Sequence, residues 1–122
     1  MKILLANYRY FVSGGPERYM FNVSDALTTR GHEIIPFSIR YKQNHTTPYS
    51  KYFVEPLGEE DQIYFRDNPF ILKTLYRTTS RFFYAKDVER VVGTLIQDTK
   101  PDIAYVLHCL HELSPSLLVG LK

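Results

Sequence analysis

The sequence predicts an α/β fold, a Rossmann-like parallel sheet with crossover helices. A short apolar run near the N-terminus leads into a glycine turn and an amphipathic helix. Two further apolar runs alternate with helical patterns, and this alternation is typical of a parallel sheet whose strands are joined by helices. The 122 residues are enough for one compact domain and too few for two.

Composition and charge exclude several classes of protein. Hydrophobic residues make up 44% and charged residues 23% of the chain, as in an average soluble domain. The formal net charge of +2 is too small for the basic face that nucleic-acid binding requires. Cys109 is the lone cysteine, so no internal disulfide forms. No apolar run is long enough to cross a membrane, and we expect a cytoplasmic protein.

The first third of the chain predicts a strand, a turn and a helix. Lys2–Ala6 is an apolar run expected to be a strand that is buried on both faces. A loop follows, and Pro16 is tolerated in the first turn of the next helix. Gly31 supplies the left-handed residue that ends such helices. The apolar stripe of this helix contains Tyr19, Met20, Val23, Ala26 and Leu27.

The remaining elements complete the alternation. We expect strands at Ile34–Ile39, Tyr52–Val54 and Ile103–Leu107, and helices at Asn68–Thr79, Arg81–Thr99 and Ser116–Gly120. Lys2–Ala6 is expected between Ile34–Ile39 and Ile103–Leu107, with all three strands parallel. A doubly wound sheet normally has about five or six strands. The smaller number visible here predicts that residues 1–122 are one partial domain of a longer chain.

The most informative segment is the loop Ser13-Gly14-Gly15-Pro16-Glu17-Arg18. Glycines after a first strand let the backbone approach a ligand, and the following helix directs free amides and a positive dipole end at a phosphate. The same glycines could serve only a tight turn from strand to helix, and the spacing leaves both interpretations open.

Two common phosphate motifs are absent. A dinucleotide fingerprint needs G-x-G-x-x-G and an acidic residue about twenty positions further on. This loop has two adjacent glycines, and Arg40 and Tyr41 occupy the place of the acidic residue. Arg40 could accept a 2′-phosphate, but the glycine pattern does not fit. No Gly-Lys-Ser or Gly-Lys-Thr occurs, which excludes a P-loop.

Three segments together resemble the family-four retaining glycosyltransferases. They are Gly14-Gly15-Pro16-Glu17-Arg18, then Arg30-Gly31-His32-Glu33-Ile34 after Leu27, and Lys100-Pro101-Asp102-Ile103. They match, in order, the family's G-G-x-E loop, its G-H-E-[VI] turn and its K-P-D-[VI] segment. The resemblance spans nearly the whole chain.

The resemblance implies the acceptor-side half of a GT-B architecture, in which two Rossmann-like domains face each other across a cleft. Gly14 and Gly15 would contact the donor diphosphate or the transferred sugar through backbone amides. The family transfers sugar from a nucleotide sugar to a carbohydrate or lipid-linked acceptor, with retention of configuration and typically without a metal or other cofactor. Its E-x7-E motif lies in the C-terminal domain and has no counterpart here, so residues 1–122 alone are expected to be inactive and to bind nucleotide sugars weakly or not at all.

Other residues are candidates for the acceptor side. His108 and His111 lie at or just after the carboxyl end of the strand Ile103–Leu107, where they could bind an acceptor, act as acid or base, or make ordinary loop hydrogen bonds. With Cys109 they lack a fourth zinc ligand. Tyr8, Arg9 and Tyr10 could contact a sugar ring or phosphate, or pack the loop.

Lys73, Arg77 and Arg81 recur every four residues and would form one basic stripe on a continuous helix. Such a stripe could lie on an anionic membrane, or it could be the solvated face of a core helix. Alternatives to the transferase are a non-catalytic α/β binding module or partner subunit, and a sugar-nucleotide epimerase of the same fold. An unfinished sheet would also expose an edge that favours self-association.

Overall fold

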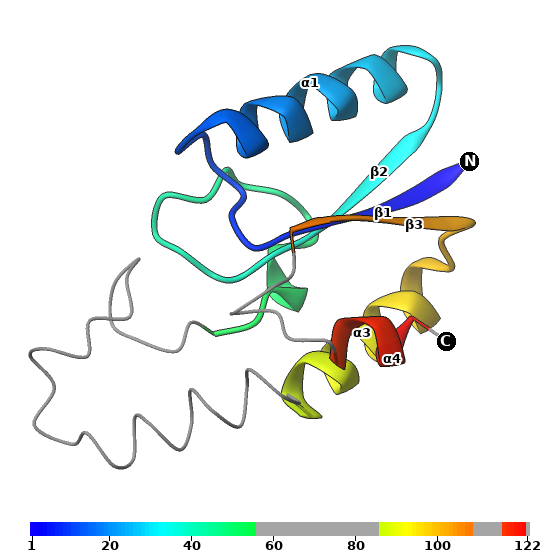
Figure 1. The fold of residues 1–122 in the computed structure, drawn as a ribbon. Helices are drawn as coiled ribbons and strands as arrows, with labels where there is room; N and C mark the ends of the chain where they lie inside the picture. Colours follow the sequence, from blue (N-terminus) through cyan, green and yellow to red (C-terminus); the bar gives the residue numbers. More distant parts are fainter. Residues whose placement is uncertain (56–85, 109–115, 122) are drawn as a thin grey trace, which may run out of the picture.

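The computed structural model describes residues 1–55, 86–108 and 116–121 (Figure 1). Its elements, in order, are β1 (Lys2–Asn7), α1 (Gly15–Thr29), β2 (Glu33–Phe37), the 3₁₀ helix η1 (Ser50–Tyr52), α3 (Lys86–Thr99), β3 (Ile103–His108) and α4 (Ser116–Gly120). The expected helix Asn68–Thr79 and the start of the helix expected from Arg81 lie outside the described residues.

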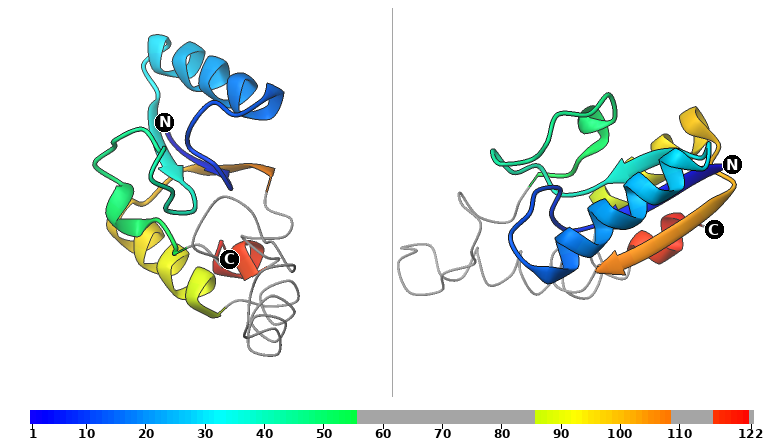
Figure 2. Two further views of the ribbon diagram at one scale, coloured as in Figure 1. Left: turned by 90° about the vertical axis from the view of Figure 1, so that its left-hand side faces the viewer. Right: turned by 90° about the horizontal axis from the view of Figure 1, so that it is seen from above.

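The three strands form one parallel sheet in the order β2-β1-β3, as the sequence predicts. α1 covers one face of this sheet, and α3 and α4 cover the other (Figures 1 and 2). The result is a small α/β domain with helices on both faces, an arrangement consistent with a Rossmann-like fold. Pro36 lies in β2, whose only described partner is β1, so its missing N–H leaves no gap in the described ladder.

β1 is the centre of the core. Leu4 and Ala6 belong to the cluster that contains Val88, Val92 and Leu95 of α3. Because side chains alternate along a strand, Ile3 and Leu5 point to the other face, beneath α1, where they too are buried. The prediction that the first strand is buried on both faces is confirmed.

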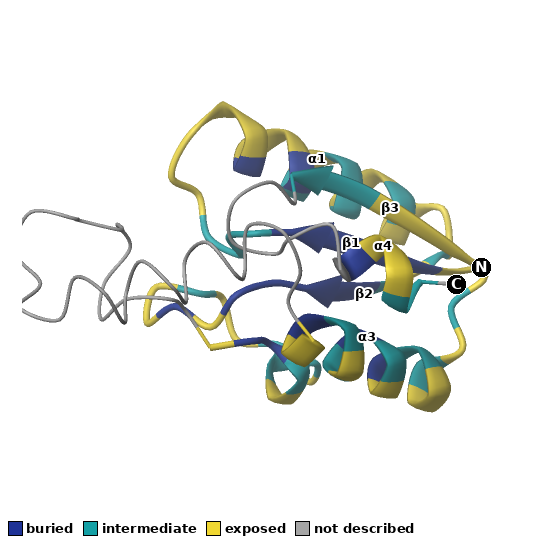
Figure 3. Cartoon of the chain, turned by 60° about the horizontal axis from the view of Figure 1, so that its bottom comes forward, coloured by how far each residue is buried: buried dark blue, intermediate teal, exposed yellow. Residues whose placement is uncertain are grey.

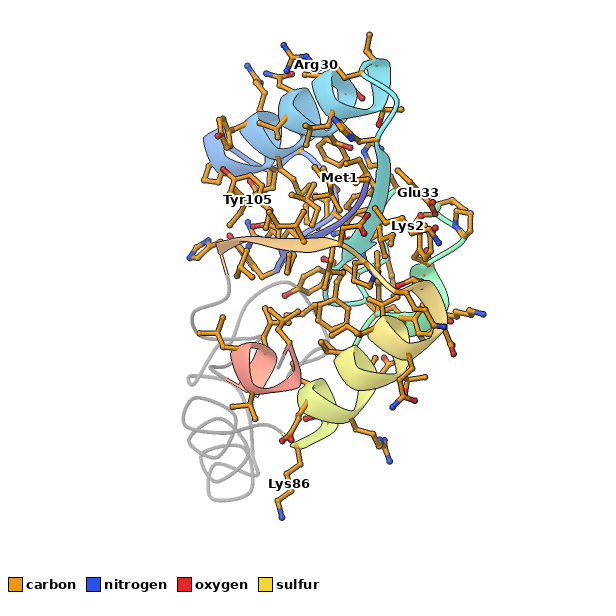
Figure 4. All side chains as sticks on the ribbon, turned by 90° about the vertical axis from the view of Figure 1, so that its right-hand side faces the viewer. Met1, Lys2, Arg30, Glu33, Lys86 and Tyr105 are labelled. Carbon is orange, nitrogen blue, oxygen red and sulfur yellow. The ribbon has the colours of Figure 1, made fainter. Side chains whose placement is uncertain are left out.

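β3 lies at the edge of the described sheet and is much less buried than β1 (Figure 3). Ile103 is 52% and Tyr105 is 36% exposed. Tyr105 lies on the α1 side of the sheet (Figure 4), and its hydroxyl is 3.1 Å from that of Tyr19.

Tyr19 itself is 51% exposed and Ala26 is also exposed, so the apolar stripe predicted for α1 is too wide.

The expected strand Tyr52–Val54 is wrong. Residues Ser50–Tyr52 form η1 instead, and Val54 makes a single parallel bridge to Ile39. Arg40 N donates to Val54 O over 2.7 Å, and Val54 N donates to Ser38 O over 3.2 Å. Within the described residues, Val54 pairs at this one position, with Ile39, which lies two residues beyond the end of β2.

The C-terminus of α1 has the hydrogen bonds of a Schellman motif. Gly31 N donates to Thr28 O over 3.0 Å and His32 N donates to Leu27 O over 3.1 Å. Gly31 has a φ of +88°, a region that side chains with a Cβ rarely adopt. The prediction that Gly31 ends this helix is confirmed, and the motif directs the chain straight into β2.

Two glycine-to-alanine substitutions are expected to change stability in opposite directions. Gly31→Ala forces a Cβ into the left-handed region and should lower the free energy of unfolding by about 1 kcal/mol. Gly93 lies inside α3 with open space around its missing Cβ. Gly93→Ala should therefore raise the free energy of unfolding by up to about 1 kcal/mol, because alanine has the higher helix propensity. Urea unfolding followed by circular dichroism measures both, and equal effects of the same sign would contradict the assigned cap.

Candidate functional site

The loop between β1 and α1 begins where all three strands end. Tyr8 N donates to His108 O over 3.1 Å, and Tyr8 O accepts from Ile39 N over 3.3 Å. The rings of Tyr8 and His108 meet edge to face, with centroids 4.7 Å apart. Two of the residues singled out in the sequence are thus brought together at the carboxyl edge of the sheet, where open α/β sheets bind ligands.

Arg9 lies beside this pair. Its guanidinium carbon is 4.8 Å from the centroid of the Tyr8 ring and 5.8 Å from that of Phe11. Its Nη1 donates to Ser13 Oγ over 2.9 Å. In the part of the chain that the structure describes, no carboxylate lies within ion-pair distance of Arg9.

Ser13 connects Arg9 to the first turn of α1. The Ser13 hydroxyl donates to Glu17 Oε2 over 3.0 Å, so a hydrogen-bonded chain runs from Arg9 through Ser13 to Glu17. Glu17 is only 2% exposed although it is an acid. The positive end of the α1 dipole stabilises a carboxylate in this turn.

The N-terminus of α1 is open at the glycines. Gly14 is the residue that caps the helix, and no side chain supplies a capping hydrogen bond. A Cβ added to Gly15 would meet nothing within 4 Å, whereas one added to Gly14 would lie 3.6 Å from Glu17 Oε2. Both glycines are exposed, so the turn has room for a ligand against its backbone.

Three buried polar side chains near this edge were not singled out as site residues from the sequence. Asn7 and Ser38 are each 1% exposed at the ends of β1 and β2. Asn7 Oδ1, Ser38 Oγ and Glu17 Oε1 have no hydrogen-bond partner among the described residues, and neither does Arg9 Nε. Of the three, Glu17 has a signal in the sequence. It follows Ser13 by four residues, which places a hydroxyl just before the helix beside an acid in the first turn.

The Tyr10 side chain packs against different residues from those that Tyr8 and Arg9 contact. Its ring packs on Phe21 at 5.2 Å, on Phe53 at 5.8 Å and on His45 at 6.2 Å between centroids. Burial, and secondarily the charge of Asp25, raise the pKa of the Tyr10 hydroxyl. Tyr10 therefore anchors the loop to α1 and to the segment before residue 55.

Arg40 is fully engaged elsewhere. Its Nη1 forms an ion pair with Glu55 at 2.8 Å, and its Nη2 lies 3.4–3.5 Å from the carbonyl oxygens of Ser50, Lys51 and Phe53. This guanidinium holds the end of η1 in place. The geometry gives no support to Arg40 as a ligand for the 2′-phosphate of a dinucleotide.

Several candidates lie outside the described residues, namely Lys73, Arg77, Arg81, Cys109 and His111. Among the helices that the structure describes, none is long and apolar enough to cross a membrane.

Comparison with known proteins gives no relative: no protein family model, curated protein or solved structure matches this chain.

The two partners of the Arg40 ion pair should differ in their effect on stability. Arg40→Ala removes the donor shared by three carbonyl groups and should lower the free energy of unfolding by about 1 kcal/mol. Glu55→Gln removes only an exposed ion-pair partner and should change it by less than about 0.5 kcal/mol. Chemical denaturation measures both, and equal losses would mean that the ion pair, not the carbonyl contacts, holds η1.

Proposed function

We propose that this chain is the N-terminal, acceptor-side domain of a retaining GT-B glycosyltransferase that uses a nucleotide sugar. The observation that carries the proposal is the open Gly14-Gly15 turn at the N-terminus of α1, on the carboxyl edge of a parallel sheet. The first of the three segments that resemble the glycosyltransferase family, Gly14-Gly15-Pro16-Glu17-Arg18, contains this turn. The GT-B architecture and the transfer chemistry rest on that resemblance.

The proposed role of the turn is to bind the donor diphosphate. Gly14 and Gly15 leave the backbone accessible, and the first-turn amides of α1 can donate to phosphate oxygens. Gly15 is exposed and a Cβ added to it would meet nothing within 4 Å, so a ligand has room to approach the backbone there. The second domain of such enzymes supplies the larger part of the nucleotide site.

The acceptor would enter beside the end of β3. His108 and Tyr8 form an edge-to-face pair there, and an aromatic surface next to a polar edge suits a sugar ring. Carbohydrate and lipid-linked acceptors both fit the family resemblance.

A non-catalytic binding module is the main alternative, and it shares the same edge of the sheet. It would bind a ligand there without consuming a nucleotide sugar. An epimerase that works through a bound dinucleotide is disfavoured by the glycine pattern and by the contacts that Arg40 makes.

Gly15→Val in the full-length protein should abolish most donor use. The added side chain would occupy the open space where phosphates approach, so we expect kcat/KM for the donor to fall at least about tenfold. The assay measures nucleoside diphosphate released from a panel of UDP-, GDP- and ADP-sugars. The far-ultraviolet circular dichroism spectrum should remain that of the wild type.

Gly93→Val is the matched control, because Gly93 also has open space around its missing Cβ but lies in α3 on the opposite face of the sheet. It should keep wild-type donor use. Wild-type activity in Gly15→Val would show that the glycines serve the turn alone. A wild-type protein that binds a sugar ligand but releases no nucleoside diphosphate would favour the binding module.

A further inference from the structure

The two loops that leave β1 and β2 carry positive charge only. Residues 8–14, before α1, and residues 38–54, after β2, contain no aspartate or glutamate. Their basic residues are Arg9, Arg40, Lys42 and Lys51. Because β1 and β2 are parallel, both loops begin at the carboxyl edge of the sheet. Glu17, the first acidic residue after β1, is only 2% exposed, so the exposed charge of these loops is positive and attracts anions.

Lys42 is the one of these four cations that the described chain leaves unengaged. Arg40 is ion-paired, Lys51 lies over an aromatic ring, and Arg9 is held by two rings and a hydroxyl. Lys42 is exposed and makes no hydrogen bond, ion pair or ring contact with the described residues. A lysine ammonium has three N–H donors, and all three are available to a ligand here.

Lys42 lies in a turn that is fixed to the loop before α1. Asn44 N donates to Tyr41 O over 3.2 Å, which closes a β-turn with Lys42 at its corner. The Asn44 side chain holds this turn in place. Its Nδ2 donates to Ile39 O over 2.7 Å, and its Oδ1 accepts from Tyr10 N over 3.3 Å. The backbone of the turn is therefore ordered in advance, which lowers the entropy lost when it binds a ligand.

A series of ring contacts connects this turn to the acceptor position beside β3. Tyr41, the first residue of the turn, meets Phe11 edge to face with centroids 6.0 Å apart. The Arg9 guanidinium lies over the rings of Phe11 and Tyr8, and Tyr8 meets His108. β2 and β3 flank β1, so their ends are two strand spacings apart, roughly 10 Å. A sugar ring beside β3 with a charged substituent directed towards β2 has a length of this order.

We propose that the acceptor of this protein carries a phosphate group and that Lys42 binds it. This inference rests on the proposed function and narrows its acceptor to an anionic one. A lysine suits a phosphate because its ammonium is a compact charge whose donors rotate freely. Lys42 follows β2 whereas the glycine turn follows β1, so this site is separate from the one proposed for the donor. A soluble sugar phosphate and a lipid-linked sugar phosphate share the chemistry.

Transfer kinetics of the full-length protein test the inference. The assay measures nucleoside diphosphate released from the preferred nucleotide sugar with two sets of acceptors. One set compares hexoses with hexose phosphates, and the other compares phosphatidylcholine vesicles that contain a neutral glycolipid with vesicles that contain a polyprenyl-phosphate-linked sugar. In one set, the phosphorylated acceptor should have the lower KM, and this preference should weaken as salt is added. The set that shows it identifies the source of the phosphate.

Lys42→Gln should raise KM for the phosphorylated acceptor about fivefold or more, because it removes a charge-assisted hydrogen bond. KM for the nucleotide sugar should stay within about twofold of the wild type. Lys42→Arg keeps the charge and should keep both values. Lys51→Gln is the matched control, since Lys51 lies over Tyr52, whose hydroxyl donates to Asp98 in the last turn of α3. It should change no KM by more than about twofold, and circular dichroism verifies the fold of each variant.

The two failures are distinguishable. A wild-type protein that binds none of the nucleotide sugars in calorimetry overturns the proposed function. Donor binding with no transfer to either phosphorylated acceptor, or with no preference for it over the neutral one, overturns the present inference alone. So does a Lys42→Gln variant that behaves like Lys51→Gln. A rise in KM for the nucleotide sugar in Lys42→Gln would assign this lysine to the donor and contradict its role towards the acceptor.

Discussion

The structure depends on one constraint, that β1 must be covered on both faces. Leu4 and Leu5 point to opposite faces of the sheet with exposures of 0% and 1%, so both faces of this strand are apolar and must be covered. Helices are therefore required above and below the sheet, and α1 and α3 supply them (Figure 2). Because all three strands are parallel, their carboxyl ends lie at one edge. The loop that leaves β1 must cross that edge to reach α1.

Crossing the edge explains why polar groups are buried there. Asn7 is the last residue of β1 and Ser38 directly follows β2, and each is only 1% exposed. Asn7 Nδ2 donates to Arg9 O over 2.8 Å, which fixes the start of the loop, while the packing of Tyr10 on Phe21 fixes its middle. Buried polar atoms without a hydrogen-bond partner are uncommon, and among the described residues such atoms belong to Asn7, Arg9, Glu17 and Ser38.

The sequence predicted the features that depend on local chemistry. The segment Lys2–Ala6 is largely apolar because it forms the middle strand of the described sheet, and an apolar run can be recognised in the sequence. Gly31 can be recognised as a helix end because its backbone is in the left-handed region, which favours glycine. The errors concern the paths of loops, which composition alone does not determine. Tyr52–Val54 has the composition of a strand, but Arg40 and η1 determine its path. The contact of Ser13 with both Arg9 and Glu17 likewise depends on how the loop folds back on α1.

The buried carboxylate of Glu17 changes what the glycine loop can do. A helix N-terminus stabilises an anion by about 0.3–1 kcal/mol at the surface, and Glu17 already receives that stabilisation. A phosphate bound beside this carboxylate would be repelled by its charge. A compensating cation is needed, and Arg9 is the basic side chain hydrogen-bonded to the same Ser13 hydroxyl. On the proposed function, the open glycines would give a ligand access to the backbone, and Arg9 would compensate the charge of Glu17 through Ser13.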